Sequence, residues 1–172
     1  HEGSLEIQEG STLSLAPGGV MNLNHNDLLN YDLLEALDEA SLENISTLYN
    51  RGKITGHRLH LQGQTLTNEE DGTLQSHDLT LVFNTLHNEG QILSPGQIDL
   101  GVTDLLENQG SIISKGSLAV KGTGTLVNRG TLQSGKKGKL SLETQKAVNH
   151  RLIKAKGELL MDSGEAFINE QG

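Results

Sequence analysis

The chain has 172 residues, of which 34% are hydrophobic and only four are aromatic, and its formal net charge at pH 7 is −9. The absence of cysteine excludes a disulfide framework and thiol chemistry, and the overall acidity argues against binding to nucleic acid. No run of 18 apolar residues occurs, so we expect no membrane span. The chain begins at His1 without a signal peptide, so we expect a processed product or a fragment of a longer chain.

Residues 1–27 predict an irregular first coil of a repeat fold. Apolar residues alternate at 5/7 and 13/15, as they do in short strands. Between Pro17 and Asp27 the chain has about nine residues more than one coil needs. We interpret this stretch as an insertion.

The following segment, 27–43, is acidic and rich in leucine. Several of its leucines have helix-like spacing, so one alternative is a short amphipathic helix inserted at the edge of a coil. The other alternative is a coil in frame with the rest of the chain. We favour the second because Asn30, Leu34 and Leu42 occupy the positions that later repeats fill with the same residue types.

An asparagine recurs at nearly regular intervals from position 28 to the end of the chain. The asparagines of this series are Asn30, Asn50, Asn68, Asn88, Asn108, Asn128, Asn149 and Asn169. An apolar residue stands two positions before each of them, and four of them begin the pattern Asn-x-Gly-x-Ile/Leu. Pairs of alternating apolar residues, such as Leu79/Leu81 and Leu118/Val120, lie midway through the coils. The period of about 20 residues leaves room for short strands and turns, and is too short for the familiar helical repeats.

This pattern predicts an all-β fold, a right-handed parallel β-helix of about eight 20-residue coils. One coil cannot bury its inward leucines alone, whereas stacked coils line them up in continuous interior columns. The asparagines are expected to form a structural ladder, in which each side chain bonds the asparagine of the next coil. The glycines that follow them are expected to supply the positive φ angles of tight turns. Residues 1–27 and 28–172 would form a single continuous solenoid.

The stretches 106–112 and 126–132 carry a resemblance to a known family. Their sequences, Leu-Glu-Asn-Gln-Gly-Ser-Ile and Leu-Val-Asn-Arg-Gly-Thr-Leu, resemble the haemagglutinin repeats of filamentous haemagglutinin-type exoproteins. That group includes adhesins, haemolysins and contact-dependent growth inhibition proteins of two-partner secretion systems. The insertion at 17–27 and Arg151, which stands where a glycine is usual, depart from the repeat.

The resemblance implies a non-catalytic shaft segment of a secreted virulence protein on the bacterial cell surface. Such a segment presents or carries adhesion or toxin-delivery regions. It would pass through an outer-membrane secretion pore during export, and we expect it to be monomeric. The repeat is specific for the architecture and carries little information about activity, because proteins of this group share the shaft and differ elsewhere.

Basic residues concentrate between positions 115 and 156, which hold ten of the 13 lysines and arginines and a single acidic residue. The basic residues of this band are Lys115, Lys121, Arg129, Lys136, Lys137, Lys139, Lys146, Arg151, Lys154 and Lys156. Two coils would carry them all, so the band is a candidate anion-binding region for lipopolysaccharide phosphates or sulfated glycans. The alternative is that lysines keep turns and strand edges soluble. A target-cell receptor that contacts the band or the 17–43 segment is a further hypothesis.

The sequence shows no motif for catalysis, metal binding or a cofactor, and we expect none of the three. A polysaccharide-degrading β-helix enzyme would need grouped carboxylates. Asp99 and Asp104 are the nearest mid-chain candidates, but Asp99 is expected to lie between Thr80 and Ala119 of the neighbouring coils. His57 and His77 fall in one column, which we expect to be a solvated exterior column.

Overall fold

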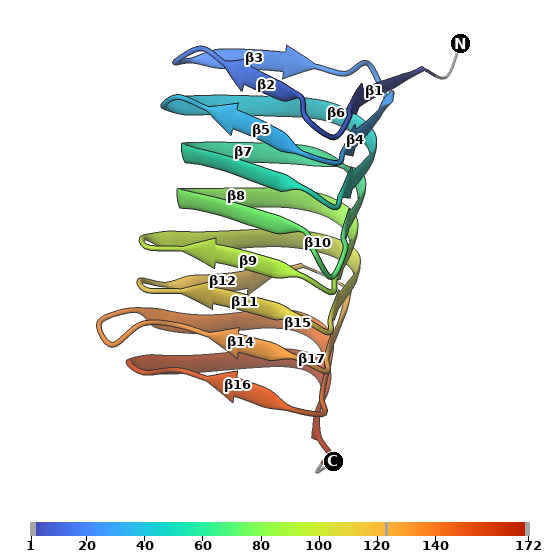
Figure 1. The fold of residues 1–172 in the computed structure, drawn as a ribbon. Helices are drawn as coiled ribbons and strands as arrows, with labels where there is room; N and C mark the ends of the chain where they lie inside the picture. The colour runs from blue at the N-terminus through green and yellow to red at the C-terminus, as the bar shows by residue number, and fades with distance from the viewer. Residues whose placement is uncertain (1–2, 123, 171–172) are drawn as a thin grey trace.

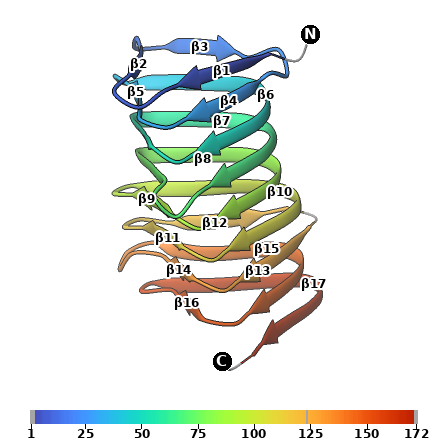
Figure 2. The same cartoon turned by 45° about the vertical axis from the view of Figure 1, so that its right-hand side comes forward.

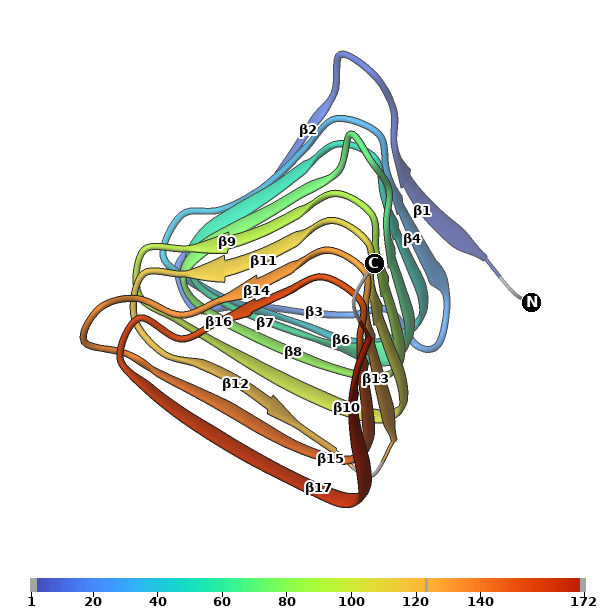
Figure 3. The same ribbon diagram turned by 90° about the horizontal axis from the view of Figure 1, so that it is seen from below.

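The computed structural model of the protein, which describes residues 3–122 and 124–170, is one parallel β-solenoid (Figure 1). The coils stack into a rod with the two termini at opposite ends (Figure 2). Seen along the rod, each coil has three sides (Figure 3). The predicted solenoid with coils of about 20 residues is confirmed. The described residues contain no helix, and so none that could cross a membrane.

The described residues form seventeen strands, and the longer ones bend around a corner of the coil. The first two coils contain β1 (Ser4–Ile7), β2 (Thr12–Leu15), β3 (Gly19–Asn22), β4 (Asp27–Asn30), β5 (Leu33–Ala36) and β6 (Glu39–Asn50). The middle coils contain β7 (Lys53–Asn68), β8 (Thr73–Asn88), β9 (Gln91–Ser94), β10 (Gln97–Asn108), β11 (Ser111–Ser114), β12 (Leu118–Lys121) and β13 (Thr125–Asn128). The last coils contain β14 (Thr131–Gln133), β15 (Lys139–Asn149), β16 (Leu152–Lys154) and β17 (Glu158–Asn169).

Each strand pairs in parallel with the equivalent strand of the next coil, so equivalent residues form columns along the rod. In one interior column Leu79 pairs with Ile98, and Ile98 pairs with Leu118. All three are almost completely buried. Aliphatic side chains suit this arrangement because alternate residues of a strand point inward and stack on the same residue type one coil away. The core therefore needs few aromatic residues.

The segment 17–27 is not an insertion, and that expectation is wrong. It contains β3, the third side of the first coil, in which Gly19 pairs with Ala40 and Met21 pairs with Leu42 of β6. Ile7 pairs with Asn30, so the first coil is only slightly longer than its neighbours. The strand is hard to recognise from sequence because its inward positions hold glycine and methionine in place of the usual leucines.

The segment 27–43 forms a coil in frame with the others, as expected. Leu34 in β5 pairs with Leu13 on one side and Ile54 on the other, and Leu42 in β6 pairs with Met21 and Leu61. The acidic and leucine-rich composition therefore arises because each strand of this coil has an inward face and an outward face. Leu28, Leu34 and Leu42 point into the core, whereas Leu37 is exposed and the acidic residues lie at half-buried or exposed positions.

The glycines after the ladder asparagines do not supply positive φ angles, and this expectation is also wrong. Among the described residues the only glycines with positive φ are Gly10 and Gly18, both in the first coil. A Cβ atom on Gly110 would lie 2.1 Å from the carbonyl oxygen of Gly90, and one on Gly130 would lie 2.0 Å from that of Gly110. Glycine is needed here because successive turns approach closely.

Replacing Gly110 with alanine is expected to lower the free energy of unfolding by about 1–3 kcal/mol, because the new Cβ atom would overlap backbone that cannot rotate away. Gly101→Ala is the matched control, since a Cβ atom there would meet only the Val82 methyl groups and the Leu81 carbonyl oxygen, at 3.7 Å or more. We expect the control to leave stability unchanged or to raise it slightly. Denaturant unfolding of both variants measures the difference. Equal losses would show that close approach is not the reason for the glycine.

Candidate functional site

The eight asparagines of the repeat form one continuous ladder at a corner of the rod. In each coil the Asn Nδ2 atom donates to the Oδ1 atom of the asparagine in the next coil, from Asn30 through Asn169, at 2.7–2.8 Å. The same amide group also donates to backbone carbonyls, such as Asn88 Nδ2 to Gly90 O at 3.2 Å. The six asparagines from Asn30 to Asn128 are at most 1% exposed. The ladder thus satisfies polar groups that burial would otherwise leave unpaired.

The ladder has a direction and a defined start. Asn30 is its first member because the equivalent position of the first coil holds Ile7. Asn30 Oδ1 is buried and has no hydrogen-bond partner among the described residues. Towards the other end of the ladder Arg151 replaces the usual glycine, and its amide donates to Asn149 Oδ1 at 3.4 Å. The ladder is a structural element of the corner, and its buried amides are not accessible to a ligand.

A second buried row, not recognised from the sequence, lies at another corner. It consists of serines two positions after an interior apolar residue: Ser76, Ser94, Ser114 and Ser134. The hydroxyls of Ser76, Ser94 and Ser114 donate to backbone carbonyls of the preceding coil at 2.9, 2.5 and 2.7 Å. A serine recurs at this position in each of four successive coils, and this regular spacing could have revealed the row in the sequence. The row lies at the corner just before the turns that carry the basic residues described next.

The structure divides the ten basic residues of the band among different faces of the rod. Arg129 forms an ion pair with Glu107, and Lys121 and Lys139 are in register with Glu143 and Glu158. The remaining basic residues apart from the half-buried Lys146 are exposed, and they lie at turns or at strand ends. The band is therefore not one uniform basic surface.

Three lysines from successive coils come together around a hollow of about 420 Å³. The hollow is lined by Ile113, Ser114, Lys115, Gln133, Gly135, Lys136 and Lys156. We call it the lysine hollow. Register explains the grouping, because Ile113 pairs with Gln133, which pairs with Lys154, and the lysines follow in the next turns. Lys136 lies in the loop between β14 and β15, which projects beyond the neighbouring coils (Figures 1 and 3).

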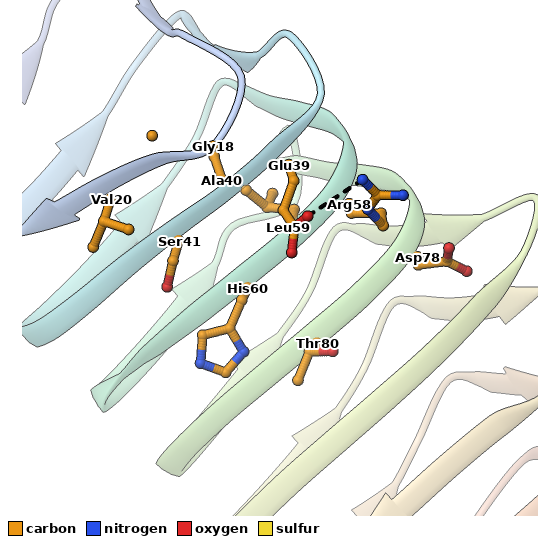
Figure 4. Close-up of a pocket in the computed structure, with 11 residues that line it drawn as sticks. Gly18, Val20, Glu39, Ala40, Ser41, Arg58, Leu59, His60, Asp78 and Thr80 are labelled. Carbon is orange, nitrogen blue, oxygen red and sulfur yellow. Dashed lines mark ion pairs between the residues drawn. The ribbon is translucent and has the colours of Figure 1, made fainter.

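A second hollow, of about 310 Å³, lies near the N-terminal end on the side formed by β3, β6, β7 and β8. Glu39, Arg58 and Asp78 lie side by side along its edge, and His60 and Thr80 lie in the adjacent column (Figure 4). Arg58 Nη2 lies 3.2 Å from Glu39 Oε2, so its charge is already neutralised. This hollow was not predicted from the sequence, although opposite charges alternate along one column from coil to coil.

His57 and His77 stack in the same column, with their ring centroids 5.1 Å apart and their planes at 15°. Each lies near a carboxylate, His57 Nδ1 at 3.7 Å from Asp38 and His77 Nδ1 at 3.3 Å from Asp78. Both side chains are about half exposed, as expected for a solvated exterior column. Within the described residues, no group of three or more histidines and carboxylates is arranged to hold a metal ion.

A family model described as the BigA fourth domain matches residues 34–150. The chain belongs to this family. The match runs from β5 to the turn after Asn149, so it includes the middle of the ladder together with Lys115 and Lys136, and it ends before Lys156. No curated protein and no solved structure matched the chain. Membership of the BigA fourth domain family and the solenoid fold fit an adhesin-like protein exposed on the bacterial surface, with a structural or adhesive role.

Proposed function

We propose that this chain is a non-catalytic structural and adhesive segment of a secreted exoprotein of the two-partner secretion type. In that role it presents adhesion or toxin-delivery regions of a longer protein. The observation that carries the proposal is the uninterrupted stack of coils held by one Asn ladder from Asn30 to Asn169. A stack in which each coil contacts only its neighbours forms an extended, stiff body suited to a shaft.

The same construction supports export through an outer-membrane secretion pore. Each coil pairs only with the coils directly before and after it, so it can fold as soon as its neighbour is in place. No cysteine is present that would cross-link distant parts before export. We propose that coils fold in succession as they leave such a pore.

The surroundings of Asp99, the mid-chain candidate for a catalytic carboxylate, support a non-catalytic role. Asp99 has Thr80 and Ala119 as its neighbours in the adjacent coils, so its column offers no second carboxylate beside it. Glycoside hydrolysis generally uses two carboxyl groups about 5–10 Å apart. Incubation with acidic polysaccharides is expected to give no new reducing ends, and measurable turnover would contradict the proposal.

Surface display tests the shaft and export functions together. The chain is placed between the pore-recognised segment of a two-partner exoprotein and a terminal epitope, in cells with and without the cognate pore. We expect the epitope on intact cells only when the pore is present, with the chain resistant to protease. A variant with Leu81→Asp in the core is the control, because a buried charge should prevent folding of the coil. Export of the wild-type chain without the pore, or in a protease-sensitive form, would contradict the proposal.

A further inference from the structure

None of the residues that line the lysine hollow is acidic, so its positive charges have no compensating charge within it. Ion pairs among the described residues involve arginines and histidines, and none includes a lysine. Lys115, Lys136 and Lys156, which line the hollow, are exposed, and Lys154, in register with the lining residue Gln133, is exposed as well. The nearest acidic residue in sequence is Glu158, which is in register with Lys139. Three positive charges therefore line one concave site.

We propose that the lysine hollow binds a sulfated or phosphorylated glycan. The proposal rests on the adhesive part of the proposed function and names its ligand. The three lining lysines come from successive coils, which are spaced about 4.8 Å apart in a parallel sheet. Neighbouring anionic groups of one polymer can therefore contact successive lysines. Ammonium groups on flexible stems bind sulfate or phosphate as point charges and do not require one fixed geometry.

The surroundings of the hollow favour a short stretch of glycan over a nucleic acid. None of the residues that line it is aromatic, so the hollow offers no surface on which bases could stack. The segments on either side of the band are acidic. Residues 51–114 contain eight acidic residues and three lysines or arginines, and residues 157–172 contain four acidic residues and no lysine or arginine. A long nucleic acid that followed the rod would meet these charges. A few saccharide units can remain within the basic coils.

The protein also offers a polar group for the sugar itself, the half-buried side chain of Gln133, which lines the hollow. The Ser114 hydroxyl beside it is buried and donates to Gly96 O at 2.7 Å and accepts from the Gly116 amide at 3.1 Å, so it fixes the wall of the hollow. Ile113 contributes an apolar surface next to them. A lysine cluster that served only solubility would need neither the concave shape nor these partners. The loop between β14 and β15 projects outward (Figure 1), and the three lysines that line the hollow are exposed to a polymer approaching from solution.

The test compares two triple variants with the same change in net charge. One replaces Lys115, Lys136 and Lys156 with glutamine, and the other replaces Lys121, Lys139 and Lys146, which belong to the band but do not line the hollow. Binding is measured by calorimetry to size-defined heparin oligosaccharides and to a phosphorylated lipopolysaccharide core freed of lipid. Neutral dextran and a single-stranded DNA of equal charge are the controls. Thermal unfolding confirms that each variant is folded.

We expect the hollow variant to lose at least about tenfold in affinity and the matched variant to change by less than about threefold. Preference for heparin identifies a sulfated ligand, and preference for the core identifies a phosphorylated one. Equal losses in both variants would overturn the proposal, because binding would then depend on net charge alone. So would absence of binding by the wild-type protein, or DNA binding as tight as glycan binding. These results would leave the export experiment of the shaft function unaffected.

Discussion

Phe83→Ala is expected to lower the free energy of unfolding by about 3–5 kcal/mol, the largest effect of any single truncation in this core. Phe83 is 1% exposed and is the largest of the fully buried side chains. Its column contains Gly63 in the preceding coil and Val102 in the following one. A Cβ atom on Gly63 would lie 2.9 Å from the Phe83 ring, so the ring fills the space that the glycine leaves open. Truncation would leave a cavity that no neighbour can fill.

The adjacent residue provides the control for this prediction. Val82 points to the outside of the same strand and is 37% exposed. Val82→Ala removes a similar kind of apolar group without opening an interior cavity, and we expect it to cost less than about 1 kcal/mol. Chemical denaturation of the two variants and the wild type measures both effects. A loss for Phe83→Ala no larger than that for Val82→Ala would contradict the packing argument.

Much of the fold could be predicted because the repeat encodes it redundantly. The interval between asparagines, the apolar residue two positions before each, and the alternating pairs midway through the coil all indicate the same register. The structure follows this register in every coil from Asn30 onward, with Asn88 opposite Asn108 and Asn108 opposite Asn128. A solenoid makes such prediction possible because each residue contacts its equivalent one period away.

The expectations that proved wrong concern positions at which a residue has a structural role other than the usual one for its type. In the first coil β3 carries Gly19 and Met21 at inward positions, and only pairing with β6 identifies it as a strand. The glycine of the Asn-x-Gly pattern predicts a positive φ, since that is its common use in turns. Here glycine is needed because stacked backbones leave no room for a side chain, since a Cβ atom on Gly110 would lie 2.1 Å from the Gly90 carbonyl oxygen. Such a separation depends on the neighbouring coil and cannot be deduced from one turn.

The candidate site could be predicted only in outline. Ten basic residues within two coils indicate a charged band, but the sequence does not show which of them share a corner. Lys136 and Lys156 are one period of the solenoid apart and line one hollow, whereas Arg129 and Lys136 are much closer in sequence and lie at different corners. Faces of a solenoid are therefore best assigned by position within the period, and a count of charges along the chain is less informative.

Asn108→Ala is expected to lower the free energy of unfolding by about 2–4 kcal/mol, although it removes only a few atoms. Asn108 is 0% exposed and stands in the middle of the ladder. It accepts from Asn88 Nδ2 and donates to Asn128 Oδ1, both at 2.7 Å, and also donates to Thr131 O at 3.1 Å. Alanine would leave the Asn128 oxygen buried without a donor and deprive the Asn88 amide of its best acceptor. An unpaired buried polar group costs about 1–3 kcal/mol, and here two are affected.

Asn84→Ala is the matched control, because Asn84 is exposed and its Oδ1 atom accepts a hydrogen bond from Thr103 Oγ1 at 3.2 Å on the surface of the rod. We expect this variant to change stability by less than about 0.5 kcal/mol. Hydrogen exchange distinguishes the ladder from general packing, since Asn108→Ala should increase exchange most at the turns after Asn88, Asn108 and Asn128. Those turns carry the backbone carbonyls that the ladder amides hold. A stability loss equal to that of Asn84→Ala, or exchange that rises evenly along the rod, would show that the asparagines merely occupy the corner. A local rise would show that the ladder joins each coil to the next, which is the property that a shaft under load requires.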